Sequence, residues 1–218
     1  MAEKVQVSES IPLGVILAFS GGFMDAYTYI CRGGVFANAQ TGNMLLFGVN
    51  ISKGDFGGAM RYIIPVVLFS LGIFISEAVR NRLKENQIIH WRQIVILAEA
   101  VILAFAAVVP LNFNLFSNAM VSMACGIQVE SFRKINGNGV ATTMCIGNLR
   151  AATEAFCDYS MFNMAEAKRK FLIYYGVVII FILGAVAGNF AVGILGRAAI
   201  IISSFILLAG FLMMFKKR

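Results

Sequence analysis

Charged side chains are scarce in this sequence. Asp, Glu, Lys and Arg make up 13% of its 218 residues, whereas 59% of the residues are hydrophobic. Soluble domains carry about 25% charged residues, and the mean hydropathy of this chain is +0.81. These values exclude a soluble domain and indicate an integral membrane protein whose surroundings are the lipid bilayer.

Metal ligands and catalytic motifs are also few. His90 is the only histidine, and none of the four cysteines forms a C-x-x-C pair. Zinc sites and dithiol redox sites need clustered ligands of these types, so we expect no metal and no cofactor. The sequence has no nucleophile motif and no phosphate-binding loop. It therefore does not predict an enzyme, although an enzyme acting on a lipid or a lipid-linked substrate stays as an alternative.

The net charge of +7 comes from 18 basic and 11 acidic residues. The basic residues cluster between apolar segments, where such residues orient membrane helices and meet anionic lipid. For this reason we expect no nucleic-acid partner.

Six segments reach the roughly 20 apolar residues that a helix needs to cross a hydrocarbon core of about 30 Å. The expected membrane helices are about Ile11–Cys31, Met60–Val79, Trp91–Val109, Asn114–Phe132, Phe171–Val192 and Ala198–Phe215. A stretch rich in glycine and amide residues separates the first helix from the second, and a similar stretch separates the fourth from the fifth. Both stretches are too polar or too short to predict a further span.

These two stretches look like copies of one another. The first, GGVFANAQTGNMLLFG, covers Gly33–Gly48, and the second, GNGVATTMCIGN, covers Gly137–Asn148. An offset of 105 residues, with no gap, places Asn43 on Asn148 and their preceding glycines on each other. The chain therefore resembles a duplicated unit in which each half carries one broken, polar element.

The basic residues indicate how the chain is threaded through the membrane. If both broken elements enter and return on the same side, there are six spans, and the outward-facing basic residues are only Arg32, Lys53, Arg61 and Arg197. If both elements cross, there are eight spans, the basic loop between residues 80 and 92 lies outside, and the bias disappears. The positive-inside rule therefore favours six spans, with the N-terminus and the C-terminus in the cytoplasm.

Six spans and two copies together predict the architecture. We expect an all-α integral membrane protein in which residues 1–218 form a single membrane domain. Its two three-helix repeats, about 11–110 and 114–215, each carry a re-entrant or broken element after the first helix. Because each repeat has an odd number of spans, the repeats have inverted topology, and their broken elements approach each other near the midplane. Inverted-repeat transporters build their sites in this way.

The broken elements carry the expected solute site. Glycine tolerates positive φ and asparagine suits a turn or a helix cap. A helix-compatible run follows each Gly-Asn pair, Met44–Val49 and Leu149–Cys157, and a helix of about nine residues reaches half the membrane. If such a half-helix begins at the midplane, it presents free N–H groups and the positive end of its dipole to a solute. The expected solute-binding residues are Asn38, Gln40, Thr41, Gly42, Asn43, Thr142, Thr143, Gly147 and Asn148. The alternative is that these residues only allow tight packing and chain reversal.

Three carboxylic acids within the apolar segments are candidates for proton or ion coupling, namely Asp25, Glu130 and Glu99. Asp25 and Glu130 match at the same offset of 105 residues. An ionised carboxylate is expensive in hydrocarbon, so an intramembrane acid is a functional candidate by default, and burial can bring its proton exchange into the physiological range. The alternative is structural pairing with Arg32, with Arg133 or with exposed backbone amides.

The first broken element and the helix before it also carry a family resemblance. Gly22, Asp25 and Tyr29 form a Gly-x-x-Asp-x-x-x-Tyr pattern, and the triplet Thr41–Asn43 follows. With these motifs and its length, the chain resembles the YoaK-like family of bacterial membrane proteins, a family of unknown function. The resemblance implies a multi-pass protein of the bacterial cytoplasmic (inner) membrane, and it implies neither a substrate nor site residues.

Taken together, the sequence favours a small secondary transporter or channel for a small solute or ion. The solute meets the two broken Gly-Asn elements near the midplane, and an intramembrane carboxylate handles a proton or cation. The alternatives are the membrane enzyme described above and a non-transporting scaffold or regulatory subunit. Six spans enclose little volume, which is compatible with a homodimer.

Overall fold

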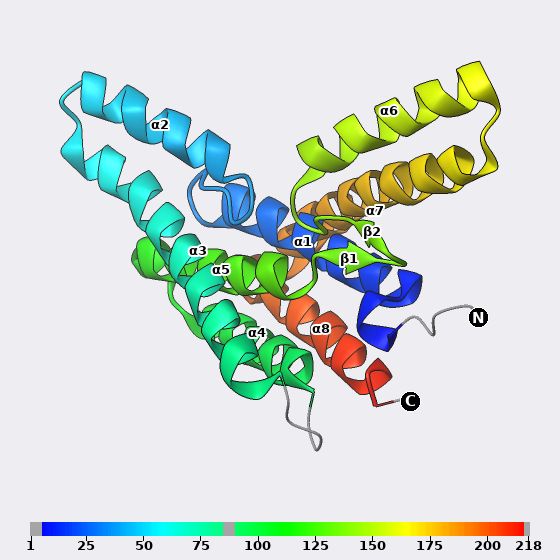
Figure 1. Ribbon diagram of the computed structural model, residues 1–218. Coiled ribbons are helices and arrows are strands. Elements are labelled where there is room, and N and C mark those ends of the chain that lie inside the picture. The colour runs from blue at the N-terminus through cyan, green and yellow to red at the C-terminus, as the bar shows by residue number, and fades with distance from the viewer. Residues whose placement is uncertain (1–5, 85–89, 216–218) are drawn as a thin grey trace.

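The computed structural model describes residues 6–84 and 90–215. The chain ends, for which the sequence predicts a cytoplasmic location, lie outside these ranges. Helices make up most of the described structure (Figure 1). In chain order the elements are η1 (Val7–Glu9), α1 (Ile11–Cys31), α2 (Gln40–Ser52), α3 (Phe56–Leu83), α4 (Trp91–Val108), η2 (Leu111–Phe113), α5 (Asn114–Ser131), β1 (Lys134–Ile135), β2 (Asn138–Gly139), α6 (Cys145–Phe162), α7 (Ala165–Leu195), η3 (Gly196–Ile200) and α8 (Ile201–Met213).

Local sequence signals explain several helix boundaries. The Ser10 side chain accepts a hydrogen bond from the first turn of α1, and Asp55 does the same for α3. His90 opens α4 as part of a capping box. These side chains satisfy backbone N–H groups that have no partner within the helix. At the other end of α1, Gly33 and Gly34 take positive φ values of +87° and +76°, which stops the helix.

Four helices, α1, α4, α5 and α8, form the central body and share one apolar core. Its largest buried side chains include Leu13, Leu17, Phe23, Met24 and Tyr27 from α1, Ile96 and Leu103 from α4, and Leu207 from α8. Helices α1 and α5 run antiparallel, because Met24 meets Cys125 whereas Leu17 meets Gln128. Most residues of α5 from Ser117 onward are buried.

The two longest helices cross this body at glycines. Where α3 crosses α5, a Cβ atom on Gly72 or on Gly126 would overlap a backbone carbonyl of the other helix. Where α7 crosses α1, Gly184 and Gly22 make the same kind of contact. Such close backbone approach between membrane helices requires small residues. Helix α3 of the first half therefore packs on α5, the first helix of the second half, and α7 of the second half packs on α1.

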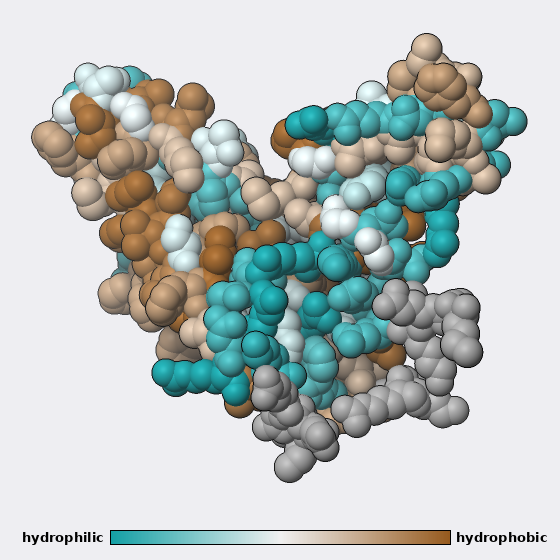
Figure 2. All heavy atoms as spheres, in the orientation of Figure 1, coloured by the Kyte–Doolittle hydropathy of each residue, from teal (hydrophilic) through white to brown (hydrophobic). Residues whose placement is uncertain are grey.

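The broken elements lead into two projecting arms. Helix α2 packs on α3, and α6 packs on α7, so that two helical hairpins diverge from the central body (Figure 1). A notch separates the arms, and both α2 and α6 begin at its base. The α2–α3 arm is mainly hydrophobic on the visible face, whereas hydrophilic residues gather over the lower part of the body (Figure 2).

The helices agree with the expected segments, with three differences. Four described stretches are long and apolar enough to cross a membrane, namely α1, α3, α4 and the continuous stretch Ala165–Met213. Helix α5, expected as a span, is absent from this set because polar residues interrupt its apolar sequence. A short hairpin, whose strands β1 and β2 have two residues each, was not expected.

The third difference concerns the broken elements themselves. Each Gly-Asn pair was expected to precede its helix, but both pairs lie inside the first turns of α2 and α6. Helix α6 also has 18 residues, longer than the half-helix of about nine residues that was expected. The physical reason is that the asparagine side chains bind the loops upstream, so the helices begin earlier.

Candidate functional site

The first broken element folds back along the helix that precedes it. After Gly33 and Gly34 turn the chain, Asn38 lies beside the middle of α1. Its backbone N–H donates to Asp25 Oδ1 at 2.7 Å, and its Nδ2 donates to the Gly21 carbonyl at 3.0 Å. Asp25 precedes the end of α1 by about 9 Å of helix rise. The chain has therefore returned toward the middle of α1 before α2 begins.

Asp25 faces the N-terminal end of α2. The backbone N–H of Asn38 donates to the Asp25 carboxyl group, and the backbone amides of Ala37 and Ala39, its neighbours immediately before this helix, lie beside it. Free N–H groups at a helix N-terminus attract acidic groups, and here the protein supplies the carboxyl group itself. No ion pair of Asp25 occurs in the described residues, so backbone amides are its partners.

The two asparagines of the Gly-Asn pairs make matching contacts. Asn43 accepts from the Phe36 N–H at 3.1 Å and donates to the Phe36 carbonyl at 2.7 Å. Asn148 accepts from the Ala141 N–H at 3.2 Å and donates to the Ala141 carbonyl at 2.6 Å. Each asparagine thus binds the residue seven positions earlier. Gln40 joins the first set, because its Oε1 accepts from Asn43 Nδ2 at 2.8 Å.

The second broken element reaches the same part of α1 from the other side. Gln128 Nε2 donates to Thr142 Oγ1 and to the Leu17 carbonyl, both at 3.1 Å, and so ties this element to α5 and α1. A Cβ atom on Gly21 would lie 3.2 Å from both the Thr142 carbonyl oxygen and Thr143 Cγ2. A side chain at this position would require its neighbours to shift by a few tenths of an ångström.

Both broken elements therefore converge on one segment of α1. Gly21 contacts Asn38 of the first element and Thr142 of the second. Cys145, the first residue of α6, interacts electrostatically with Asp25, as expected if α6 also begins near this carboxylate. Figure 1 shows the beginnings of α2 and α6 at the base of the notch. We call the segment Gly21–Asp25 with its contacts the convergence point.

Glu99 lies close to this point but has a different environment. It is 0% exposed, and neither carboxylate oxygen has a hydrogen-bond partner among the residues that the structure describes. The Cys125 thiol lies near both Glu99 and Asp25 and is 3.7 Å from Met24 Sδ. The two acids are therefore close to the same buried thiol.

Glu130, the third expected acid, lies elsewhere. It forms an ion pair with Arg133, which also contacts Glu77 at 3.3 Å, and Arg80 lies 2.9 Å from Glu77. The helix crossings explain this placement. At the crossings, Gly126 of α5 takes the place that Gly22 takes in α1. These two glycines are 104 residues apart, whereas the two Gly-Asn pairs are 105 residues apart. A shift of one residue turns a side chain by about 100° around the helix, and so Glu130 points away from the convergence point.

A row of polar side chains on α5 leads toward the convergence point. Asn118, Ser122 and Cys125 follow at i, i+4 and i+7 and therefore share one face. Within residues 6–84 and 90–215, Asn118 Oδ1 and Ser122 Oγ have no hydrogen-bond partner. Asn118 also lines a cavity of about 300 Å³ together with Arg61 and Asn114. The α5 row thus extends from this cavity to the neighbourhood of the two acids.

Further unpartnered polar atoms lie at the convergence point. In the described part of the chain these are Asn38 Oδ1, Gln128 Oε1 and Thr143 Oγ1, and all three residues are buried. Native proteins pair most buried polar atoms, so these atoms can accept hydrogen bonds from a water molecule or a polar ligand.

The expected solute-binding residues fall into three groups. Asn38, Thr142 and Thr143 are buried at the convergence point. Gln40, Asn43 and Asn148 are buried as well, but their amide groups are engaged in holding the broken elements together. Thr41 and Gly147 are exposed, and Gly42 packs on the Phe36 ring.

Sequence reasoning missed the contribution of α5. Asn118, Ser122, Cys125 and Gln128 were assigned only to an apolar span. The signal was present, because polar residues at i, i+4 and i+7 in a membrane segment mark one helix face. Arg32 was also missed as a buried structural residue.

Comparisons with known proteins bear on the family of this chain. The family model described as "Protein of unknown function (DUF1275)" matches residues 13–213. The chain is also 25% identical over 167 residues to the UPF0700 transmembrane protein YoaK of Bacillus subtilis (strain 168), which covers 72% of this chain and 71% of that protein. No solved structure matches. Because the family model spans nearly the whole chain, this membrane protein belongs to the DUF1275 family, and its YoaK-like resemblance is confirmed.

Proposed function

We propose that this protein is a small secondary transporter or channel of the bacterial cytoplasmic membrane, whose solute or ion passes the convergence point. The observation that carries the proposal is that Asn38 from one broken element and Thr142 from the other both contact Gly21. Irregular backbone at membrane depth persists only where it is buried in protein or lines a watery cavity. Discontinuous helices that meet at the midplane are how many transporters build a site.

The architecture that we propose has six spans in two inverted repeats. Antiparallel α1 and α5 support it, and so do the matching glycine crossings and the matching contacts of Asn43 and Asn148. In this arrangement the broken elements are re-entrant, the two arms point to opposite faces of the membrane, and the chain termini are cytoplasmic. The cavity beside Arg61 is then an outer vestibule, and the α5 row connects it with the two acids.

Asp25 and Glu99 are the residues that we propose for proton or ion coupling. Glu99 is buried without a hydrogen-bond partner among the described residues, an environment in which a negative charge is costly. Asp25, in contrast, has backbone amides in place to stabilise a negative charge. Two nearby acids in different environments suit a proton relay. Glu130 stays a candidate only if its ion pair with Arg133 opens.

Proteoliposomes test this proposal. The full chain is reconstituted into liposomes that enclose a pH-sensitive dye. Gradients of amino acids, sugars and inorganic ions across the liposome membrane are then imposed in turn. We expect at least one gradient to drive flux, and Glu99→Gln to lower that flux by about tenfold or more because a carrier that cannot release a proton loses its coupling. Glu154→Gln is the matched control, since Glu154 is an exposed acid that pairs with Arg150. Flux that survives both Glu99→Gln and Asp25→Asn removes these acids from the mechanism.

A non-transporting scaffold or regulatory subunit is the second candidate, and one observation favours it. Gln40, Asn43 and Asn148 close the broken elements on themselves, as rigid packing elements would. For this candidate, every gradient gives the flux of protein-free liposomes. We propose no enzyme activity, because the sequence contains no nucleophile motif.

A further inference from the structure

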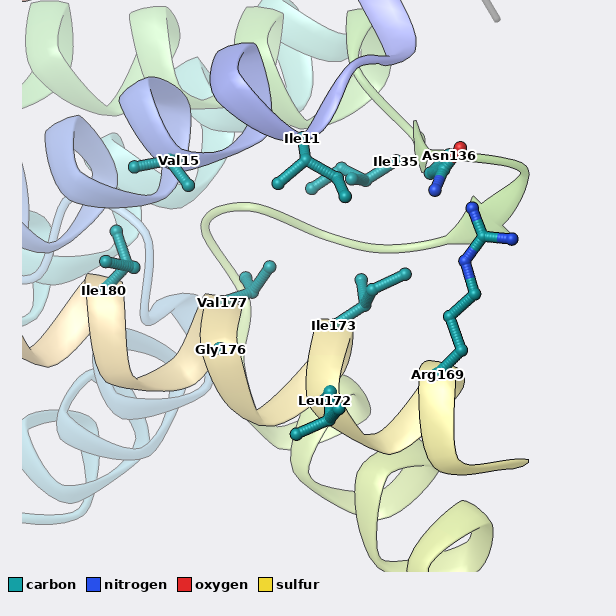
Figure 3. A pocket seen from close by; sticks show the side chains of 10 residues that line it. All are labelled: Ile11, Val15, Ile135, Asn136, Arg169, Leu172, Ile173, Gly176, Val177 and Ile180. Carbon is teal, nitrogen blue, oxygen red and sulfur yellow. The ribbon is translucent and has the colours of Figure 1, made fainter. Parts of the chain in front are cut away.

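A second cavity, of about 350 Å³, lies between α1, α7 and the β1–β2 hairpin (Figure 3). Its walls are almost entirely aliphatic. They include Ile11, Val15, Ile135, Leu172, Ile173 and Val177. At one end, Arg169 of α7 extends toward Asn136 of the hairpin (Figure 3). The cavity is thus an apolar groove with a cation at its mouth.

Arg169 differs from the basic residues on either side of it. Lys168 lies 5.8 Å from the Tyr159 ring centroid, and Lys170 pairs with Glu166 at 3.0 Å. No hydrogen bond or ion pair of Arg169 occurs in residues 6–84 and 90–215. Its guanidinium group is therefore available to a ligand.

The groove and the cation together define the chemistry of that ligand. A guanidinium group can bind a phosphate through two parallel hydrogen bonds. The aliphatic walls require a hydrocarbon, and at about 30 Å³ for a water-sized group, 350 Å³ accommodates roughly ten to twelve methylene groups. A molecule with a phosphate at one end and a long hydrocarbon chain at the other fits both features.

We propose that this groove binds one anionic phospholipid, with its phosphate at Arg169 and one acyl chain between α1 and α7. The position of Arg169 in the membrane also favours an anionic lipid. The positive-inside rule predicts that the basic run 168–170 lies on the cytoplasmic side, and basic pockets between helices on that side bind anionic head groups. The bound acyl chain contacts α7 and the N-terminal end of α1, where the α6–α7 arm leaves the body. It therefore holds that arm against α1. This inference does not depend on transport.

Lipid retention by the purified full chain tests the proposal. Protein in a neutral detergent is mixed with dioleoyl-phosphatidylglycerol or with dioleoyl-phosphatidylcholine, and bound lipid is counted by native mass spectrometry. We expect the anionic lipid to be retained and Arg169→Gln to weaken its binding by about tenfold, the loss that corresponds to 1.4 kcal/mol. Lys170→Gln, one residue away and engaged with Glu166 in the native protein, leaves retention unchanged.

A second variant tests the acyl chain separately. Gly176 lines the groove, and no heavy atom lies within 4 Å of a Cβ built on it. Gly176→Leu therefore folds but fills the groove, and we expect it to lose the lipid although Arg169 is intact. Equal retention by wild type, Arg169→Gln and Gly176→Leu overturns the proposal.

Two other occupants give different results. If inorganic phosphate displaces phosphatidylglycerol from the wild type and binds Gly176→Leu equally well, the site binds free phosphate and the lipid proposal is wrong. If the wild type is a dimer that Gly176→Leu converts to a monomer, a second copy of the chain covers the groove, and the proposal is wrong in that case too.

Discussion

Arg32 is a fully buried cation whose partners are all neutral. It is 0% exposed, and it donates five hydrogen bonds. The acceptors are Tyr27 Oη, the carbonyl oxygens of Ala106, Val109 and Pro110, and Asn114 Oδ1. Most of these carbonyls belong to the C-terminal end of α4, where backbone acceptors lack helical partners and the helix dipole is negative. Arg32 thus joins α1 to the end of α4, and it does not form the carboxylate pair that the sequence left open as an alternative.

This role predicts a large loss of stability in Arg32→Gln. Removing a buried, fully bonded charge leaves several carbonyls without donors, which costs about 3 kcal/mol or more, equivalent to about 6–12 °C in melting temperature for a chain of this size. Thermal unfolding of the detergent-solubilised protein measures the effect. Arg61→Gln serves as the control because Arg61 is exposed. A melting temperature of Arg32→Gln equal to that of the control would show that α4 does not need this cap.

At the scale of helices, the glycine crossings determine how the two halves fit together. Gly126 of α5 meets the backbone of α3 at Phe69, and Gly22 of α1 meets that of α7 at Phe181. A side chain in such a crossing contacts backbone, which cannot rotate away as a side chain can. The packing of α3 on α5 and of α7 on α1 therefore depends on the absence of a Cβ atom at these glycines.

Gly126→Ala and Gly48→Ala form a matched pair that tests these crossings. Both glycines lie inside helices, but only a Cβ on Gly126 overlaps its surroundings, and nothing lies within 4 Å of one on Gly48. We expect Gly126→Ala to lower the free energy of unfolding by about 1–3 kcal/mol through overpacking. Gly48→Ala raises it by up to about 1 kcal/mol, because alanine has the higher helix propensity. Melting temperatures in detergent distinguish the two. If both variants respond alike, helix propensity and not close packing governs these positions.

At the scale of the whole molecule, inverted repeats require the tips of the arms to face opposite sides of the membrane. The α2–α3 tip contains Lys53, and the α6–α7 tip lies near Ser160; both residues are exposed. The two arms diverge from the body in Figure 1, so their tips are well separated.

Cysteine labelling tests this topology. In a background without the four native cysteines, Lys53→Cys and Ser160→Cys are exposed to a membrane-impermeant maleimide on intact cells. We expect Lys53→Cys to react from outside and Ser160→Cys to react only after permeabilisation, because few basic residues surround the first tip and several surround the second. Labelling of both tips from the same side of the membrane contradicts the inverted repeat.

Much of the fold could be predicted from the sequence, because the signals are local. Apolar length predicted the helices, the Gly-Asn pairs located both broken elements, and the motif around Asp25 indicated the family. The helix starts were less certain, since Asn43 and Asn148 act on loops seven residues upstream and so move α2 and α6 to earlier beginnings.

The sequence by itself determined that this is a helical membrane protein with two interrupted elements, and its motifs indicated the YoaK-like family, a resemblance that the family match confirms. Only the tertiary structure decided which polar groups meet. A one-residue difference between the glycine crossings and the Gly-Asn pairs turns Glu130 to an ion pair with Arg133, while Glu99, distant in sequence, lies near Asp25. The physical reason is that composition and spacing define a helix and its faces, whereas the crossing geometry between helices decides which face meets which neighbour.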